Sequence, residues 1–126
     1  MFKRIDHVEL IPRDLQKTVD FYTQVLGFSV KSRRKMEAGP MKEIAFLTLG
    51  DTMIELLDVQ NVQESTPDTR RMGYRMIALE VDDMERTLEY LKGRGISPSM
   101  GPVNLGPSKR AEILDPNGNS IELRQW

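Results

Sequence analysis

The sequence predicts an α+β fold in which a β-α-β-β-β module occurs twice. Two internal repeats carry this prediction. Residues 5–15 return as residues 74–84, and both copies show an apolar strand pattern that leads into an aspartate-capped helix. Residues 50–57 return as residues 117–124, and both copies are a turn followed by a strand. Because each half is too small to be stable alone, we expect the two copies to fold together and to close one site between them.

Length and composition narrow the possibilities further. With 126 residues the chain is long enough for one ordinary domain and too short for two independent ones. We therefore expect a single domain, with module one over residues 1–60, a connector over 61–73 and module two over 74–126.

Charge and cysteine content exclude several functions. A net charge of -1 predicts no general attraction to nucleic acid or to an anionic membrane. The chain has no cysteine, which excludes disulfides, thiolate chemistry and cysteine-ligated metals. It shows no apolar leader and no apolar run of membrane-spanning length, so we expect a cytoplasmic protein.

The first half of the chain begins with a short strand and a helix. Period-two alternation over residues 7–10 predicts a half-buried strand, which Pro12 ends. Asp14 is a good N-cap for the following helix, and Gly27 is suited to close it. The apolar residues of this helix fall on one stripe: Leu15, Val19, Tyr22, Val25 and Leu26.

Further strands complete both halves. The first half continues with strands over 28–33, 43–49 and 52–57, and the last two are joined by a turn at Gly50-Asp51. The second half repeats this order with a strand over 75–81, a helix over 83–92, and strands over 110–114 and 119–124 around a turn at 115–118. The passage 93–107 is rich in Gly and Pro and has no apolar period, so we expect residues 97–107 to form a mobile flap over a cavity.

Strand alternation assigns the side chains to two faces. One apolar set is spaced to pack under the helices: Val8, Leu10, Ile54, Leu56, Ile77, Leu79, Ile121 and Leu123. The opposite face is where a site would lie, and it carries His7, Glu9, Met53, Glu55, Leu57, Met76, Ala78, Ser120, Glu122 and Arg124.

Glu55 is the most informative residue on that face. Its neighbours Met53 and Leu57 are apolar, and a buried carboxylate without a partner costs several kcal/mol, so a metal ion or a cationic group is expected nearby. A solvated strand face is the alternative. Glu122 matches Glu55 by the repeat, although its own neighbours are polar. His7 is the only imidazole in the chain, and both a structural role and a ligand role are open to it.

Several separated motifs resemble one known family. They are the Asp-His pair at 6–7, a helix with Asp-Leu, Asp-Phe-Tyr and Leu-Gly-Phe at 14–28, and Asp-Pro-Asn-Gly-Asn-Ser-Ile-Glu-Leu at 115–123. In these motifs the chain resembles the vicinal oxygen chelate superfamily, which includes glyoxalase I, bleomycin-resistance proteins and dioxygenases. The resemblance covers essentially the whole chain. It implies that the sheets curl into a half-open barrel around a cavity and that a homodimer completes the site, but it does not fix the reaction.

The resemblance also implies a set of metal ligands, two from each half. It maps them onto His7 and Glu55 in the first half and onto Met76 and Glu122 in the second. Methionine is a poor ligand for hard or borderline divalent ions, so three donors are left to hold Zn, Ni, Co or Mn. A branch that has lost its metal, with Met76 as cavity wall, is the alternative. Glu122 is the catalytic base by resemblance to glyoxalase I, and Glu9, Met53, Leu57, Met76 and Arg124 line the cavity.

Two functions follow from these alternatives. One is a metal-dependent lyase or isomerase that acts on a small substrate with vicinal oxygens through an enediolate-like intermediate. The other is a metal-free small-molecule-binding protein of the bleomycin-resistance type. Ile11 stands where glyoxalase I enzymes carry an arginine, which argues against a glutathione adduct as substrate. One histidine per chain cannot supply the two-histidine iron site of a ring-cleaving dioxygenase unless a second subunit contributes.

Overall fold

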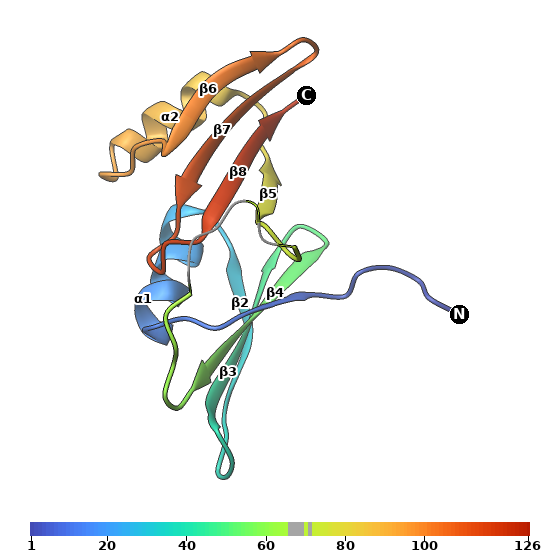
Figure 1. The fold of residues 1–126 in the computed structure, drawn as a ribbon, viewed down its shortest axis with the longest axis vertical. Coiled ribbons are helices and arrows are strands. Elements are labelled where there is room, and N and C mark those ends of the chain that lie inside the picture. Colours follow the sequence, from blue (N-terminus) through green and yellow to red (C-terminus); the bar gives the residue numbers. More distant parts are fainter. Residues whose placement is uncertain (66–69, 71) are drawn as a thin grey trace. The chain divides into compact units, whose positions relative to one another are not determined.

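The doubled module is visible in the order of the elements. The structure is a computed structural model that describes residues 1–65, 70 and 72–126. Its contacts divide the chain into two compact units, Met1–Ser65 and Thr66–Trp126. Each unit follows the order β-α-β-β-β, which confirms the predicted α+β class and the two tandem modules (Figure 1). That the units form one domain stays a prediction. The predicted connector 61–73 includes residues 66–69 and 71, which lie outside the described residues.

The first unit is a four-stranded mixed sheet with one helical segment. The sheet has the order β1-β4-β3-β2, in which β1 is parallel to β4 and the other pairs are antiparallel. Its elements are β1 (Val8–Leu10), α1 (Leu15–Asp20), the π-helical turn η1 (Phe21–Val25), β2 (Ser29–Lys35), β3 (Met41–Leu49) and β4 (Thr52–Val59).

The helical segment of this unit begins and ends at the predicted residues but changes its winding. The Asp14 side chain caps it by accepting a hydrogen bond from the Lys17 backbone N–H at 3.0 Å. Beyond Asp20 the predicted α-helix continues as the π-helical turn η1, and Gly27, with a φ of 82°, ends the segment. The Tyr22 ring is fully buried.

The apolar face of the first sheet packs as predicted except at its edge. Ile54 and Leu56 of β4 are buried, and α1 contacts this strand. Val8 was expected in the same apolar set but is 39% exposed. The reason is that β1 is an edge strand of only three residues, so it has a neighbouring strand on one side alone.

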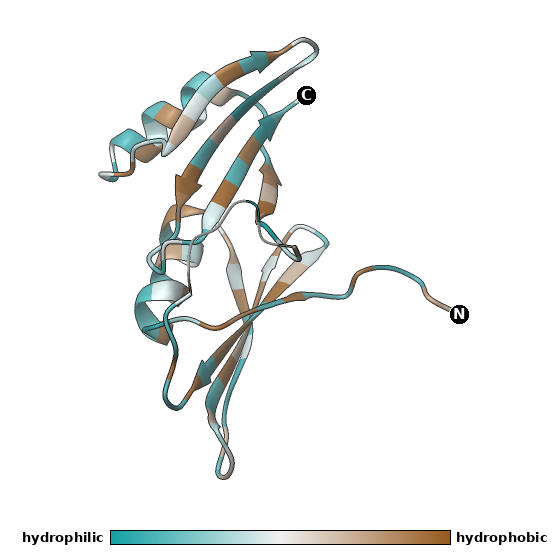
Figure 2. Cartoon of the chain, in the orientation of Figure 1, coloured by the Kyte–Doolittle hydropathy of each residue, from teal (hydrophilic) through white to brown (hydrophobic). Residues whose placement is uncertain are grey.

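The second unit is built in the same way. Its sheet has the order β5-β8-β7-β6, and α2 packs against β7 and β8 (Figure 1). Polar and apolar residues alternate along β8, which Figure 2 shows as teal and brown bands. In the described part of the chain, no helix is long and apolar enough to cross a membrane. The elements are β5 (Ile77–Glu80), α2 (Met84–Lys92), β6 (Met100–Leu105), β7 (Ser108–Leu114) and β8 (Ser120–Gln125).

One predicted loop is a strand. The passage 93–107 was expected to be irregular, but β6 lies within it and pairs with β7 in antiparallel register. The register shifts between Met100 and Val103, around Gly101 and Pro102, and this irregularity accommodates two residues that fit a regular strand poorly. The expectation of an irregular passage is therefore wrong for residues 100–105.

The two units pair their equivalent strands in the same register. In the first unit Glu9 lies opposite Glu55 and Leu10 opposite Leu56. In the second unit Ala78 lies opposite Glu122 and Leu79 opposite Leu123. Position 55 therefore corresponds to 122, and positions 7 and 9 correspond to 76 and 78, as the sequence repeat predicted.

Candidate functional site

A cluster of three possible metal ligands lies in the first unit. His7 directly precedes β1 and Glu9 lies within it, so both side chains face the same side of the sheet. Glu55 of β4 is the register partner of Glu9. One ligand atom from each of the three residues lies within 4.8 Å of the other two. The parallel pairing of β1 with β4 thus brings together three of the residues that the sequence placed on the site face.

Both nitrogens of the His7 ring face carboxylates. Nε2 lies 2.9 Å from Oε2 of Glu55 and 3.5 Å from Oε1 of Glu9. On the other side of the ring, Nδ1 lies 2.9 Å from Oδ2 of Asp6. A carboxylate at the far nitrogen is the usual support of a metal-binding histidine, because it fixes the ring orientation and leaves the other nitrogen for the ion.

The pKa shifts at this cluster follow from these contacts. The hydrogen bond with Asp6 is the largest effect on the pKa of His7 and raises it, while burial opposes this. The pKa of Glu55 is raised as well, first because the side chain is buried and then because the Glu9 charge lies nearby. The cluster therefore holds an excess of negative groups around one imidazole, which favours a bound cation.

The surroundings of Glu55 differ on its two sides. Its neighbours along β4 are Met53, which is half-buried, and Leu57, which is buried. Glu55 itself is only 7% exposed, whereas Glu9 is exposed. The cluster is thus closed by apolar side chains at Glu55 and open to solvent at Glu9, so it has room for water or for a substrate.

A hollow lies next to the cluster on the same face of the first sheet. The Phe46 ring meets the His7 ring edge-on, with 5.6 Å between the ring centroids. Phe46 also lines an open pocket of ≈ 380 Å³, and the other lining residues are Ser32, Arg33, Arg34 and Ile44. Phe46 therefore lies between this pocket and the His7 ring.

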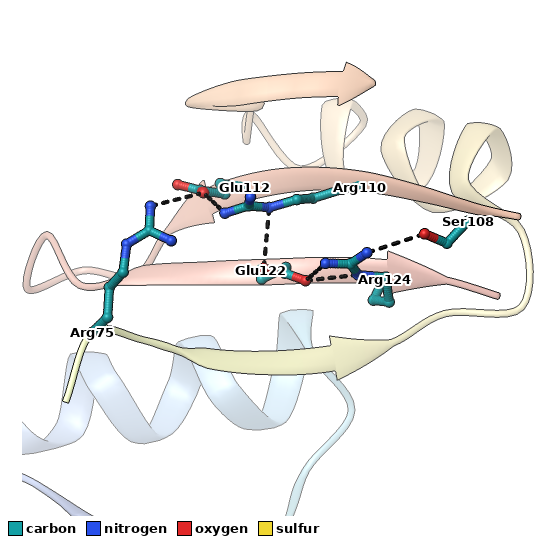
Figure 3. A network of polar contacts seen from close by, with 6 residues as sticks. All are labelled: Arg75, Ser108, Arg110, Glu112, Glu122 and Arg124. Atoms are coloured by element: carbon teal, nitrogen blue, oxygen red, sulfur yellow. Dashed lines mark hydrogen bonds and ion pairs between the residues drawn. The ribbon is translucent and has the colours of Figure 1, made fainter. Parts of the chain in front are cut away.

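Glu122, the predicted ligand and base, has arginine partners in the second unit. Its Oε1 accepts a hydrogen bond from Nε of Arg124 at 2.8 Å, and Nη2 of Arg124 lies 2.6 Å from the same oxygen. Nε of Arg110 lies 3.1 Å from its Oε2 (Figure 3). Met76 directly precedes β5 and is half-buried. Metal ligation by Glu122 and the missing ligand at Met76 stay predictions.

Some residues beside His7 and around Glu122 were not predicted as site residues. Asp6 could have been singled out, because it adjoins the only histidine. From the sequence, the basic pair Lys109-Arg110 could either meet an anionic substrate or be solvated. Glu112 was not singled out, and only the pairing of β7 with β8 brings Arg110 and Glu112 to Glu122. Arg75 lies just before β5 and gave no signal in the sequence.

Comparison with known proteins identifies the class of protein. A family model described as the Glyoxalase/Bleomycin resistance protein/Dioxygenase superfamily matches residues 4–123. The chain therefore belongs to this superfamily, as its motifs predicted.

Individual relatives agree with this assignment. A probable lactoylglutathione lyase of Vibrio cholerae is 37% identical over 97% of this chain and 90% of its own length. The lactoylglutathione lyase of Escherichia coli O157:H7 is 35% identical over 95% of this chain and 90% of its own length. Among solved structures, a glyoxalase family protein from Enterococcus faecalis matches with a TM-score of 0.84 and 25% identity, and the match covers 98% of each chain.

Proposed function

We propose that this chain is a glyoxalase-type lyase that holds a divalent metal ion with His7, Glu9 and Glu55 and acts on a small substrate with vicinal oxygens. The observation that carries the proposal is the convergence of these three donors, whose ligand atoms lie within 4.8 Å of one another. The names of the two bacterial relatives, which are lactoylglutathione lyases at 37% and 35% identity, favour this activity over metal-free binding.

The donor set suits the proposed ion. One imidazole nitrogen and two carboxylate oxygens are acceptable ligands for Zn, Ni, Co or Mn, and three protein donors leave positions free for water or substrate. When bound, the ion acts as a Lewis acid toward the vicinal oxygens of the substrate. Asp6 keeps the His7 ring turned so that Nε2 faces the two carboxylates.

The reaction also needs a carboxylate that moves a proton. In an isomerisation through an enediolate-like intermediate, the base removes a proton from one of the two oxygen-bearing carbons and returns it to the other. Glu122 is the proposed base by resemblance to glyoxalase I. The guanidinium groups of Arg110 and Arg124 hold its carboxylate in one orientation.

This chain departs from the glyoxalase I pattern at a residue that would bind the thiol part of the substrate, such as glutathione. Ile11 is 53% exposed and offers no charge to a glutathione carboxylate. We therefore expect adducts of glutathione and of the smaller thiol N-acetylcysteine to be turned over at similar rates.

The experiment measures the formation of the lactoyl thioester from methylglyoxal and each thiol. The protein is stripped of metal and then reloaded with Zn, Ni, Co or Mn. We expect turnover with at least one metal, none with the stripped protein, and at least a 100-fold loss in His7→Ala. Glu37→Gln is the matched control, since Glu37 is an exposed carboxylate outside the cluster and should leave turnover unchanged. Metal-loaded protein without turnover would rule out the lyase.

A metal-free small-molecule-binding protein of the bleomycin-resistance type is the second candidate. The observation in its favour is Met76, which stands where the family pattern has a ligand. It becomes the better description if the stripped and reloaded proteins bind no metal.

We also propose a homodimer, because the sheets have exposed edges. The cytoplasmic location stays a prediction from the sequence.

A further inference from the structure

A network of arginines and carboxylates lies on one face of the second sheet. The buried apolar residues of β7 and β8, such as Ile113 and Ile121, alternate with the members of the network. The network therefore occupies the opposite face of these strands. Its six residues are Arg75, Ser108, Arg110, Glu112, Glu122 and Arg124 (Figure 3).

The network is continuous through Arg110. Nη2 of Arg110 donates to Oε1 of Glu112, and its Nε lies 3.1 Å from Oε2 of Glu122. Glu122 in turn holds Arg124, whose Nη1 donates to Oγ of Ser108 at 3.0 Å. The side chains of the two carboxylates are 11% and 13% exposed, so these ion pairs are only partly screened by solvent.

The network has one more positive group than negative groups. Three guanidinium groups face two carboxylates, which leaves a net charge of about +1. Arg75 is the least engaged of the three. Its side chain is 49% exposed, and its one ion pair in the network is a long contact of 3.7 Å from Nη2 to Oε1 of Glu112. The buried Nε of Arg110 forms no hydrogen bond of good geometry in the described structure, and its contact is the 3.1 Å ion pair with Glu122. Arg75 is therefore the guanidinium group of the network that lacks a close carboxylate.

The first unit shows that the sheet does not need these charges. Position 55 corresponds to 122, so by strand register Arg110 corresponds to Ile44, Glu112 to Phe46 and Arg124 to Leu57. The same fold is therefore built with apolar side chains at all three positions. Partly buried ion pairs are often no more stabilising than apolar residues of similar size, so stability gives no reason for the arginines.

We propose that this face of the second unit binds the carboxylate group of a small anionic molecule, with Arg75 and Arg110 as the recognising residues. A planar guanidinium group matches a carboxylate in two parallel hydrogen bonds. Because Arg75 has no close carboxylate in the network, a ligand with a negative charge is favoured over an uncharged ligand of the same shape. In the binding of this anion, Glu112 and Glu122 are positioning residues that hold the arginine side chains. The proposal does not depend on the lyase activity or on a metal ion.

The experiment titrates metal-stripped protein with pyruvate and with pyruvamide, which keeps the same skeleton without the charge. The arginine Nε–H resonances are followed by NMR in the presence of a chelator, so that binding at the His7 cluster does not interfere. We expect pyruvate to shift the signals of Arg75 and Arg110 with saturation in the millimolar range. Pyruvamide should bind at least tenfold more weakly, and inorganic phosphate, titrated in the same way, should bind no more tightly than pyruvate.

Variants distinguish binding of the carboxylate by Arg75 and Arg110 from a general effect of positive charge on the protein. Arg75→Ala should weaken pyruvate binding at least tenfold, and Arg110→Lys should do the same because it keeps the charge but loses the paired donors. Arg86→Ala is the matched control, since Arg86 is an exposed arginine on α2. Equal shifts with pyruvate and pyruvamide, tighter binding of phosphate, or equal affinities of the Arg75→Ala and Arg86→Ala variants would overturn the proposal.

Discussion

At the scale of single residues, equivalent strand positions in the two units carry different chemistry. His7 and Glu9 stand beside Glu55 in the first unit, whereas Met76 and Ala78 occupy their positions relative to Glu122 in the second. The first unit therefore collects negative groups around an imidazole, which suits a cation. The second unit surrounds its glutamate with arginines, which suits an anion.

The change of Met76 to histidine tests whether the second unit contributes to the metal site. We expect Met76→His to tighten divalent-metal binding at least tenfold, or about 1.4 kcal/mol, because it restores the fourth donor of the family pattern. Titrations with Zn, Ni, Co and Mn measure the change. Met36→His is the matched control, since Met36 is a half-buried methionine outside the cluster. A normally folded Met76→His variant without any gain would show that position 76 does not reach the metal.

The sequence predicted one part of the residue-level chemistry and missed another. Glu55 could be recognised because its apolar neighbours leave a carboxylate in need of a positive partner, and His7 lies against it. The Arg110 network could not be recognised, since alternating charges on a strand look the same whether they are solvated or paired. Only the register between β7 and β8 brings Arg110 to Glu122 and Arg124.

At the scale of the elements, strands with apolar alternation and capped helices were predictable, whereas β6 was not. Gly101 and Pro102 interrupt its pattern, and the pairing partner that makes it a strand is β7. The predicted flap over residues 97–107 thus contains an edge strand that is hydrogen-bonded to β7, the strand that carries Arg110 and Glu112.

Gly101 lies close to the backbone of β7. A Cβ at this residue would lie 2.7 Å from the backbone oxygen of Arg110, and its φ is +78°. We therefore expect Gly101→Ala to lower the free energy of unfolding by about 2 to 5 kcal/mol, from overpacking and from the left-handed backbone together.

Gly106→Ala is the matched control for this effect. Gly106 belongs to the same hairpin and has a φ of +68°, but a Cβ there would meet nothing within 4 Å. Gly106→Ala should lower the free energy of unfolding only by the cost of a left-handed backbone at a residue with a side chain, about 1 to 2 kcal/mol. Urea denaturation of the two variants measures the difference, and equal destabilisation would mean that β6 does not lie against Arg110 as described.

At the scale of the whole molecule, one module occurs twice and carries different side chains on corresponding faces. Both units keep the same strand order, register and helix placement, so the fold alone does not decide what each face binds. The superfamily could be identified from separated motifs along the whole chain, because these motifs are caps, turns and strand positions that the module requires. The substrate could not be identified in this way, since it depends on how side chains from different strands meet.

The most direct test of the central proposal is metal binding by the first unit's cluster, measured by calorimetric titration of the full chain with Zn. Substitution of Glu9 tests the proposed site best, because Glu9 is the third donor that the first unit adds to His7 and Glu55. We predict that Glu9→Gln weakens binding at least tenfold, that His7→Ala abolishes it, and that Glu37→Gln matches the unchanged chain. Equal affinities of the Glu9→Gln and Glu37→Gln variants would contradict the proposed site.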